Sequence, residues 1–181
     1  MNIYYSNPWS SSKNMGGAIN AFCRIVPNGS DWIIIQDGDI CYLTPDWGNR
    51  IEQALQLDGD KFGLVGCYTN RLAANTQLHL GRFSENMNIP HHYNIAAAYN
   101  GQGIEALRPE ENIAGLFMAF RKEVWEQVGG FREKTPCFDT FFSRAVKECG
   151  HRIGLIRSLY VFHAYRPWSR SPRQDNKHLF L

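Results

Sequence analysis

The stretch Trp32-Ile33-Ile34-Ile35-Gln36-Asp37-Gly38-Asp39 is an apolar run that ends in two carboxylates separated by a glycine. Its four bulky apolar residues predict a strand that is buried on both faces of a sheet. Ligands of open α/β sheets bind outside the carboxyl ends of such strands, which is where Asp37 and Asp39 stand. Two carboxylates can converge on one divalent cation, and Gly38 lets a phosphate group approach the backbone. The stretch therefore predicts a metal and diphosphate site.

The same acidic triplet occurs a second time, as Asp58-Gly59-Asp60. Because Asp-Gly is common turn chemistry, a surface turn is the alternative interpretation of the first copy. The second copy follows the polar end of an expected helix and precedes an expected strand, which predicts a solvated connection. Since only the first copy stands at the carboxyl end of a strand, we place the candidate site there.

Upstream, the sequence predicts a β-α-β unit that leads into the acidic strand. Residues 2–5 form the first expected strand, and a helix with Asn14 as its N-cap carries apolar residues at helical spacing. If the two strands are parallel, the loop of residues 6–12 lies at the same sheet edge as Asp37. By this placement, the candidates for base or ribose contacts are Tyr5, Ser6 and Asn7.

Downstream, regular segments enclose one long irregular segment. Thr44-Pro45 predicts a helix start, because Thr is a good N-cap and Pro suits the first helical position. Residues 69–109 lack a clear periodicity, and this length predicts a substrate-facing excursion. Further strands are expected at 62–68, 113–120 and 155–162, further helices at 121–128 and from Asp139, and then His163 and a basic tail with Arg166, Arg170 and Arg173.

The composition bounds the class of protein. A chain of 181 residues predicts one domain, and a formal charge of +2 argues against a nucleic-acid partner. The five cysteines are odd in number and form no CxxC pair, which disfavours a zinc knuckle or a disulfide framework and favours a reducing cytoplasm. No apolar run is long enough to predict a transmembrane segment, and the N-terminus lacks the features of a signal peptide.

Three blocks of the sequence resemble glycosyltransferases of the GT-A fold, in particular the inverting family 2 and the related polypeptide N-acetylgalactosaminyltransferases. The blocks cover roughly half of the chain and keep the family's order. They look like the family's Asp-X-Asp motif with its upstream helix, its strand, helix and Gly-Gly-Phe segment, and its Glu-Asp helix. In this chain they are Gly17, Ala18 and Asn20 with Asp37-Gly38-Asp39; residues 115–131, ending in Gly129-Gly130-Phe131; and Phe138-Asp139 with Arg144 and residues 149–153.

The resemblance implies an α/β fold, a single GT-A-like and Rossmann-like domain with a mixed sheet flanked by helices. Because the acidic motif already comes at residue 37, the N-terminal half is shorter than in the family, and a strand and helix that normally help to hold the base have no counterpart. The whole chain, 1–181, is one domain on this interpretation. Its expected parts are a nucleotide and metal half (1–68), an irregular acceptor-facing segment (69–112), a catalytic half (113–165) and a basic tail or lid (166–181).

The resemblance also implies a metal ion and its ligands. Asp39 matches the direct metal ligand, and Asp37 is a ligand or contacts the ribose or a metal-bound water. His163 matches a position where several GT-A enzymes supply a histidine to the metal; a structural histidine at a strand end is the alternative. A mixed carboxylate and imidazole shell favours Mn²⁺, with Mg²⁺ as the second choice.

Asp139 falls on the aspartate of the family's Glu-Asp pair, which implies a general base for the acceptor hydroxyl. The family's glutamate is replaced by Phe138. The alternative role for Asp139 is N-cap of the helix that it begins, because that role needs the same residue type.

Two glycines and the tail complete the set of candidates. Gly115 and Gly130 are expected to leave space for the donor sugar, or else they only end and begin regular elements. Arg166, with Arg170 and Arg173, is expected to clamp the diphosphate, because guanidinium groups bind phosphate oxygens bidentately. An exposed basic end is the alternative for this tail.

Together these features predict a metal-dependent glycosyltransferase of the hexosyl- or N-acetylhexosaminyltransferase class. It would move a sugar from a nucleotide-diphosphate sugar, with a UDP-sugar favoured, to a hydroxyl of a glycan or another acceptor, with inversion. One alternative is a non-catalytic GT-A module that binds nucleotide or glycan. A nucleotidyltransferase is a further alternative, but it would leave Asp139 and the Gly-Gly-Phe block unexplained.

Overall fold

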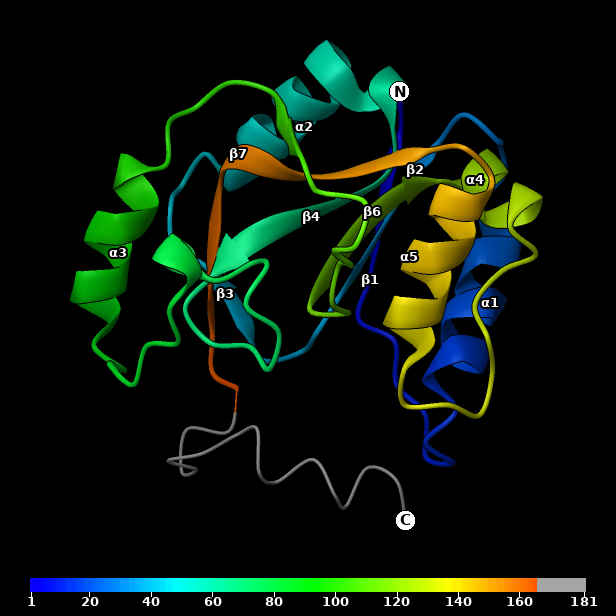
Figure 1. Cartoon of the computed structure of the whole chain (residues 1–181), viewed down its shortest axis with the longest axis horizontal. Helices are drawn as coiled ribbons and strands as arrows, with labels where there is room; N and C mark the ends of the chain where they lie inside the picture. Colours follow the sequence, from blue (N-terminus) through cyan, green and yellow to red (C-terminus); the bar gives the residue numbers. More distant parts are fainter. Residues whose placement is uncertain (166–181) are drawn as a thin grey trace.

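The computed structural model describes residues 1–165, which form one mixed sheet with helices against both faces (Figure 1). The strands run in the order β1-β2-β6-β4-β7-β3, and β5 pairs with the first half of β7. This is the predicted α/β architecture. The elements are β1 (Ile3–Ser6), α1 (Met15–Ile25), β2 (Trp32–Gln36), β3 (Ile40–Tyr42), α2 (Trp47–Asp58), β4 (Phe62–Thr69), α3 (Ile89–Ala98), β5 (Ile104–Ala106), β6 (Phe117–Arg121), α4 (Lys122–Gln127), α5 (Phe138–Glu148) and β7 (Arg152–His163), with short 3-10 turns at Gly59–Lys61 and His79–Gly81.

The predicted β-α-β unit opens the chain. β1 pairs in parallel with β2, and Ser6 lies opposite Ile35. Asn14 is the N-cap of α1, and its side chain accepts a hydrogen bond from the Gly17 N–H at 3.1 Å, which satisfies one of the donors that a helix start leaves unpaired. The loop after Ser6 therefore lies at the same sheet edge as Asp37, as expected.

Two apolar clusters, one on each face of the sheet, hold the helices in place. Ile33 and Ile35 pack with α1, α4 and α5, whereas Trp32 and Ile34 pack with α2 on the other face. Figure 1 shows α1, α4 and α5 gathered on one side of the sheet. Both faces of β2 are thus covered, which is why four consecutive apolar residues are needed; burying each such side chain stabilises the fold by roughly 1.5–3 kcal/mol.

Strand β7 ends beside the acidic triplet. It runs parallel to β4 and antiparallel to β3. β3 begins at Ile40, directly after Asp39, and Ile40 lies opposite His163. The Ala164 N–H donates to the Asp39 carbonyl at 3.0 Å. This pairing brings Asp39 and His163, far apart in the sequence, side by side.

The structure corrects the expected start of one helix and the extent of one strand. Helix α2 begins at Trp47 with Asp46 at the N-cap position, and the Thr44 carbonyl accepts from the Trp47 N–H at 3.3 Å in the turn before it. The strand expected over 113–120 is regular only from Phe117. Residues 113–116 instead form part of a cleft wall.

The segment expected to be irregular contains the ten-residue helix α3. Asn88 caps it by accepting from the His91 N–H at 3.0 Å. Its buried residues are His92 and Ala96, so the apolar stripe that identifies most helices is missing. Within residues 1–165, no helix has both the length and the apolar run that crossing a bilayer requires.

Candidate active site

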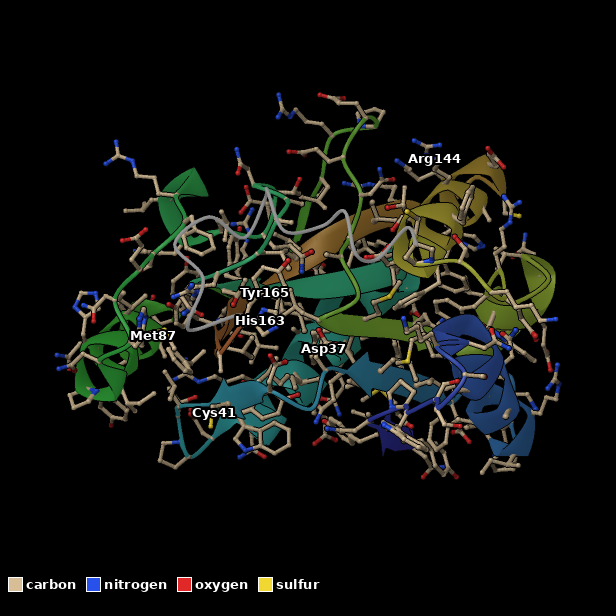
Figure 2. The ribbon with its side chains drawn as sticks, turned by 90° about the horizontal axis from the view of Figure 1, so that it is seen from below. Asp37, Cys41, Met87, Arg144, His163 and Tyr165 are labelled. Carbon is tan, nitrogen blue, oxygen red and sulfur yellow. The ribbon has the colours of Figure 1, made fainter. Side chains whose placement is uncertain are left out.

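Asp37 and Asp39 stand where β2 ends and the chain turns into β3. The Asp37 N–H donates to the Leu116 carbonyl at 3.0 Å, which extends the pairing of β2 with β6 by one residue. With His163, these carboxylates form a group of three potential metal ligands whose atoms all lie within 4.8 Å of one another. Figure 2 shows Asp37 and His163 close together near the middle of this face. The structure therefore brings together all three residues expected to bind metal.

The imidazole of His163 is oriented by a buried carbonyl. Its side chain is 2% exposed, and Nδ1 lies 2.8 Å from the carbonyl oxygen of Arg71. Because a carbonyl oxygen only accepts, Nδ1 carries the proton. Nε2 faces Asp39 Oδ1 at 3.2 Å and Asp37 Oδ2 at 3.7 Å. In the neutral ring, Nε2 thus presents a lone pair to two carboxylates, and a cation or an added proton must balance this arrangement.

The two carboxylates have opposite pKa shifts. A hydrogen bond from the protonated His163 ring lowers the pKa of Asp39 below its ordinary value. Withdrawal from water raises the pKa of Asp37, and the charges of Asp39 and Asp139 add to this effect while His163 opposes it. Three carboxylates around one imidazole leave an excess of negative charge, which a divalent cation would relieve.

The donor set fits a divalent cation. The side chains of Asp37 and Asp39 are 44% and 50% exposed, so each can offer oxygen to a ligand from the solvent side. Gly38 keeps this side open, because a Cβ at that position would meet nothing within 4 Å. Oxygen ligands combined with the His163 nitrogen suit Mn²⁺ better than Mg²⁺, which prefers oxygen alone.

Asp139 lines the cleft next to this group. The cleft has a volume of about 540 Å³, and Asp37, His163 and Asp139 all contribute to its wall. Asp139 Oδ2 accepts from the Gly115 N–H at 2.9 Å, and Oδ1 accepts from the Thr140 N–H at 2.6 Å. Burial raises the pKa of Asp139 in spite of these hydrogen bonds. A fixed carboxylate with a raised pKa in a cleft has the properties of a general base.

Asp139 does not cap helix α5. The helix begins at Phe138, and Cys137 occupies the N-cap position without a side-chain capping bond. Asp139 belongs to the first turn and reaches the Gly115 N–H in the neighbouring loop. The capping role that was the alternative for this residue is therefore wrong.

The two candidate glycines lie in different places. Gly115 lines the cleft, and a Cβ there would come within 2.9 Å of the Phe138 ring, so this glycine admits the start of α5. Gly130 has φ of +83° and lines a separate cleft between α4 and α5. Its neighbour is Asn20, whose Oδ1 accepts from the Trp125 Nε1–H at 3.0 Å. The structure thus brings Gly115, but not Gly130, to the cleft of Asp139.

The residues expected near the base or ribose lie along the end of β1. Asn7 Oδ1 accepts from Gln36 Nε2 at 3.0 Å, which connects this loop to the residue before Asp37. Tyr5 packs edge-on against Trp47 with ring centroids 5.8 Å apart and lines another cleft at the N-terminus. Ser6 is the last residue of β1. Arg166, Arg170 and Arg173 lie outside the described residues, and their expected roles stay predictions.

Two buried polar residues that the sequence analysis did not identify organise the site. Asn70 Oδ1 accepts from the His163 N–H at 2.7 Å, and Asn70 Nδ2 donates to the His163 carbonyl at 3.2 Å. Gln77, fully buried, donates to the Cys67 carbonyl at 3.1 Å and accepts from the Ala114 N–H at 2.7 Å. One available signal was position, because Asn70 directly follows β4 just as Asp37 directly follows β2.

Comparison with known proteins bears on the fold. No protein-family model and no curated protein matches this chain. Among solved structures, the mannosyltransferase PcManGT from Pyrobaculum calidifontis, in complex with GDP-Man and Mn²⁺, is similar, with a TM-score of 0.53 and 18% identity. This chain has a glycosyltransferase fold. The match covers 84% of this chain and 37% of that chain, so this chain spans little more than a third of the mannosyltransferase. The narrower resemblance to family 2 and to the polypeptide N-acetylgalactosaminyltransferases stays a prediction.

Proposed function

We propose that this protein is a metal-dependent glycosyltransferase that moves a sugar from a nucleotide-diphosphate sugar to an acceptor hydroxyl, with inversion. The observation that carries the proposal is the orientation of His163, whose Nε2 faces Asp39 and Asp37 at 3.2 and 3.7 Å beside the cleft that holds Asp139. A metal site and a base in one cleft are what this reaction needs. The complex of the similar mannosyltransferase with GDP-Man and Mn²⁺ supports the same interpretation.

Asp39, Asp37 and His163 would hold Mn²⁺, or Mg²⁺, at the end of β2. The bound cation would stabilise the leaving diphosphate without proton transfer. Asp39 is the direct carboxylate ligand in this proposal, and Asp37 is a second ligand or contacts the ribose or a metal-bound water. Arg71 supports them indirectly, because its carbonyl keeps the proton of His163 on Nδ1 and leaves Nε2 available.

Asp139 would take the proton of the acceptor hydroxyl as the hydroxyl oxygen attacks the anomeric carbon. The N–H groups of Gly115 and Thr140 hold one carboxylate oxygen each and so fix the direction of the base. A raised pKa makes the ionised Asp139 a better proton acceptor than an exposed aspartate. Attack from the side opposite the leaving group inverts the anomeric centre.

The donor class, the acceptor class and the compartment belong to the same proposal. We favour a UDP-sugar of the hexosyl or N-acetylhexosaminyl class, and the GDP-sugar of the similar mannosyltransferase is the second choice. The acceptor is the hydroxyl of a glycan or of another molecule. All five cysteines are free, which fits a reducing compartment such as the cytoplasm.

The test is release of nucleoside diphosphate from a panel of UDP- and GDP-sugars, with Mn²⁺ and with EDTA. We expect release that requires the metal. Asp139→Asn should lower the rate about 10²–10⁴-fold, the usual contribution of a general base, without weakening donor binding by more than about twofold. The matched control is Glu148→Gln, an exposed carboxylate at the far end of the same helix, which should leave the rate unchanged.

Three other outcomes would each contradict part of the proposal. Full activity of Asp139→Asn would exclude Asp139 as the base. Tight Mn²⁺-dependent nucleotide binding without release from any donor would favour a non-catalytic binding module. Release of pyrophosphate in place of nucleoside diphosphate would indicate a nucleotidyltransferase.

A further inference from the structure

A second cleft adjoins the cleft that contains Asp139. Its volume is about 830 Å³, and it shares Thr76 and Glu111 with the first cleft. Thr76 belongs to the loop after β4, and Glu111 belongs to the loop before β6. The two clefts therefore meet along a common wall, and a ligand that enters the first can continue into the second.

Two tyrosine rings form part of the second cleft. Tyr68 and Tyr99 have ring centroids 5.0 Å apart and are tilted against each other. The Tyr68 hydroxyl donates to Glu105 Oε2 at 3.0 Å, and the Tyr99 hydroxyl lies 2.8 Å from His79 Nδ1. Because both hydroxyls are held, the rings are fixed as part of the wall. The electron-rich face of such a ring attracts the polarised C–H groups of a sugar.

The charged residues of the second cleft balance one another. Its carboxylates are Glu105 and Glu111, and its guanidinium groups are Arg108 and Arg157. Arg108 already pairs with Glu111 at 3.1 Å. A phosphate-bearing ligand would need an excess of positive charge, whereas sugar hydroxyls both donate and accept and so suit equal numbers of acceptors and donors.

The wall between the clefts is held by buried and partly buried hydrogen bonds. Lys147 Nζ donates to the carbonyls of Pro109 and Glu111, both at 2.7 Å, and fixes the loop before β6. Gln77 connects the loop after β4 to Ala114. A wall that is fixed before the ligand arrives lowers the ordering cost of binding.

From these features we infer that the acceptor is an oligosaccharide that occupies both clefts. Its reacting sugar lies against Asp139, and the next sugar lies against Tyr68 and Tyr99. This inference rests on the proposed function and narrows its acceptor to a chain of linked sugars, in place of a single sugar, a lipid alcohol or a protein hydroxyl. Contacts to the second sugar would position the reacting hydroxyl against the base.

The test uses the full chain and an array of immobilised monosaccharides and of the di- to hexasaccharides built from them. We expect retention on one or more oligosaccharides, at least about tenfold stronger than on the matching monosaccharide. The double variant Glu105→Ala/Arg157→Ala removes two exposed side chains of the second cleft and should weaken retention about tenfold. The control Arg24→Ala/Glu148→Ala, exposed elsewhere, should retain glycans like the unsubstituted chain. Urea unfolding verifies that both variants fold.

A parallel titration with Mn²⁺ and UDP or GDP separates this inference from the proposed function. The double variant should bind Mn²⁺ and nucleotide like the unsubstituted chain. Equal retention of mono- and oligosaccharides, retention that is insensitive to the double variant, or no retention of any glycan beside intact nucleotide binding would each overturn the inference and leave the glycosyltransferase proposal standing. Cleft-dependent glycan retention without any nucleotide binding would support the second cleft and overturn the proposed function.

Discussion

The two Asp-Gly-Asp triplets have the same sequence and different surroundings. In the second triplet, residues 58–60, Asp58 accepts a hydrogen bond from Lys61 Nζ at 2.6 Å. Asp60, whose side chain is 87% exposed, pairs with Arg121. Each carboxylate of this triplet therefore has a cationic partner, and the triplet joins α2 to β4 as a solvated connection, as the sequence predicted.

In the first triplet, residues 37–39, neither carboxylate pairs with Lys or Arg within the described part of the chain, and both face His163. The triplet follows β2, which runs parallel to β4 and β7, so the chain segments after these three strands meet at one sheet edge. The residue types are identical in the two triplets. Their position in the sheet decides that one is neutralised by the chain itself and the other is left to a cation.

The largest expected effect comes from removing one carboxylate of each triplet. Asp39→Ala should lower kcat/KM for sugar transfer about 10³-fold, equal to about 4 kcal/mol, because a group that acts on the leaving diphosphate is lost. Asp60→Ala should change it less than about twofold, because its ion pair is exposed. Steady-state release of nucleoside diphosphate measures both. Similar losses in the two variants would mean that the first triplet has no special role.

Metal binding should distinguish the triplets in stability as well. Mn²⁺ at about 100 times its Kd should raise the free energy of unfolding by about 2.7 kcal/mol, and EDTA should reverse the gain. Asp39→Ala should abolish this gain, whereas Asp58→Asn/Asp60→Asn should keep it in full. Urea unfolding with and without Mn²⁺ is the measurement. A gain that survives Asp39→Ala would place the metal elsewhere.

The next effect concerns the support of His163. Asn70→Ala removes both hydrogen bonds that this side chain makes with the His163 backbone and leaves the backbone N–H buried. We expect a loss of about 2 kcal/mol in the free energy of unfolding and a fall of about tenfold in Mn²⁺ affinity. Asn28→Ala removes an exposed side chain that contacts Asp31 and should cost less than about 1 kcal/mol. An unchanged Mn²⁺ affinity in Asn70→Ala would show that His163 does not need this support.

How far the sequence predicts the site depends on whether a residue's role is local. The strand before Asp37 was predictable, because a run of four apolar residues is visible in the sequence. His163 was predicted from the resemblance to a known fold. The pairing of Ile40 with His163, which brings the ligands together, depends on the register between two distant strands, and no local pattern encodes it.

Asn70 and helix α3 were missed for related reasons. Asn70 acts on a residue 93 positions away, and a buried amide has no periodic signal. Helix α3 buries His92, whose Nδ1 lies 2.7 Å from the Tyr160 hydroxyl, so hydrogen bonding takes the place of an apolar stripe. Asp139 shows the opposite case, because its residue type fitted both a cap and a base, and only the hydrogen bond from Gly115 separates them.

The smallest expected effect contrasts Asp139 at the site with Asp58 of the second triplet through the pH dependence of stability. Burial raises the pKa of Asp139, so its contribution to stability is present below the ordinary aspartate pKa and lost as pH rises through the folded pKa. The hydrogen bond from Lys61 lowers the pKa of Asp58, so its contribution is present above the ordinary pKa and lost as pH falls through the folded pKa. Relative to the unsubstituted chain, Asp139→Asn should therefore gain stability as pH rises from about 4, and Asp58→Asn should gain it as pH falls below about 4. Urea unfolding of the metal-free proteins across this range measures both slopes, and slopes of the same sign would mean that the two aspartates do not differ in the way their surroundings predict.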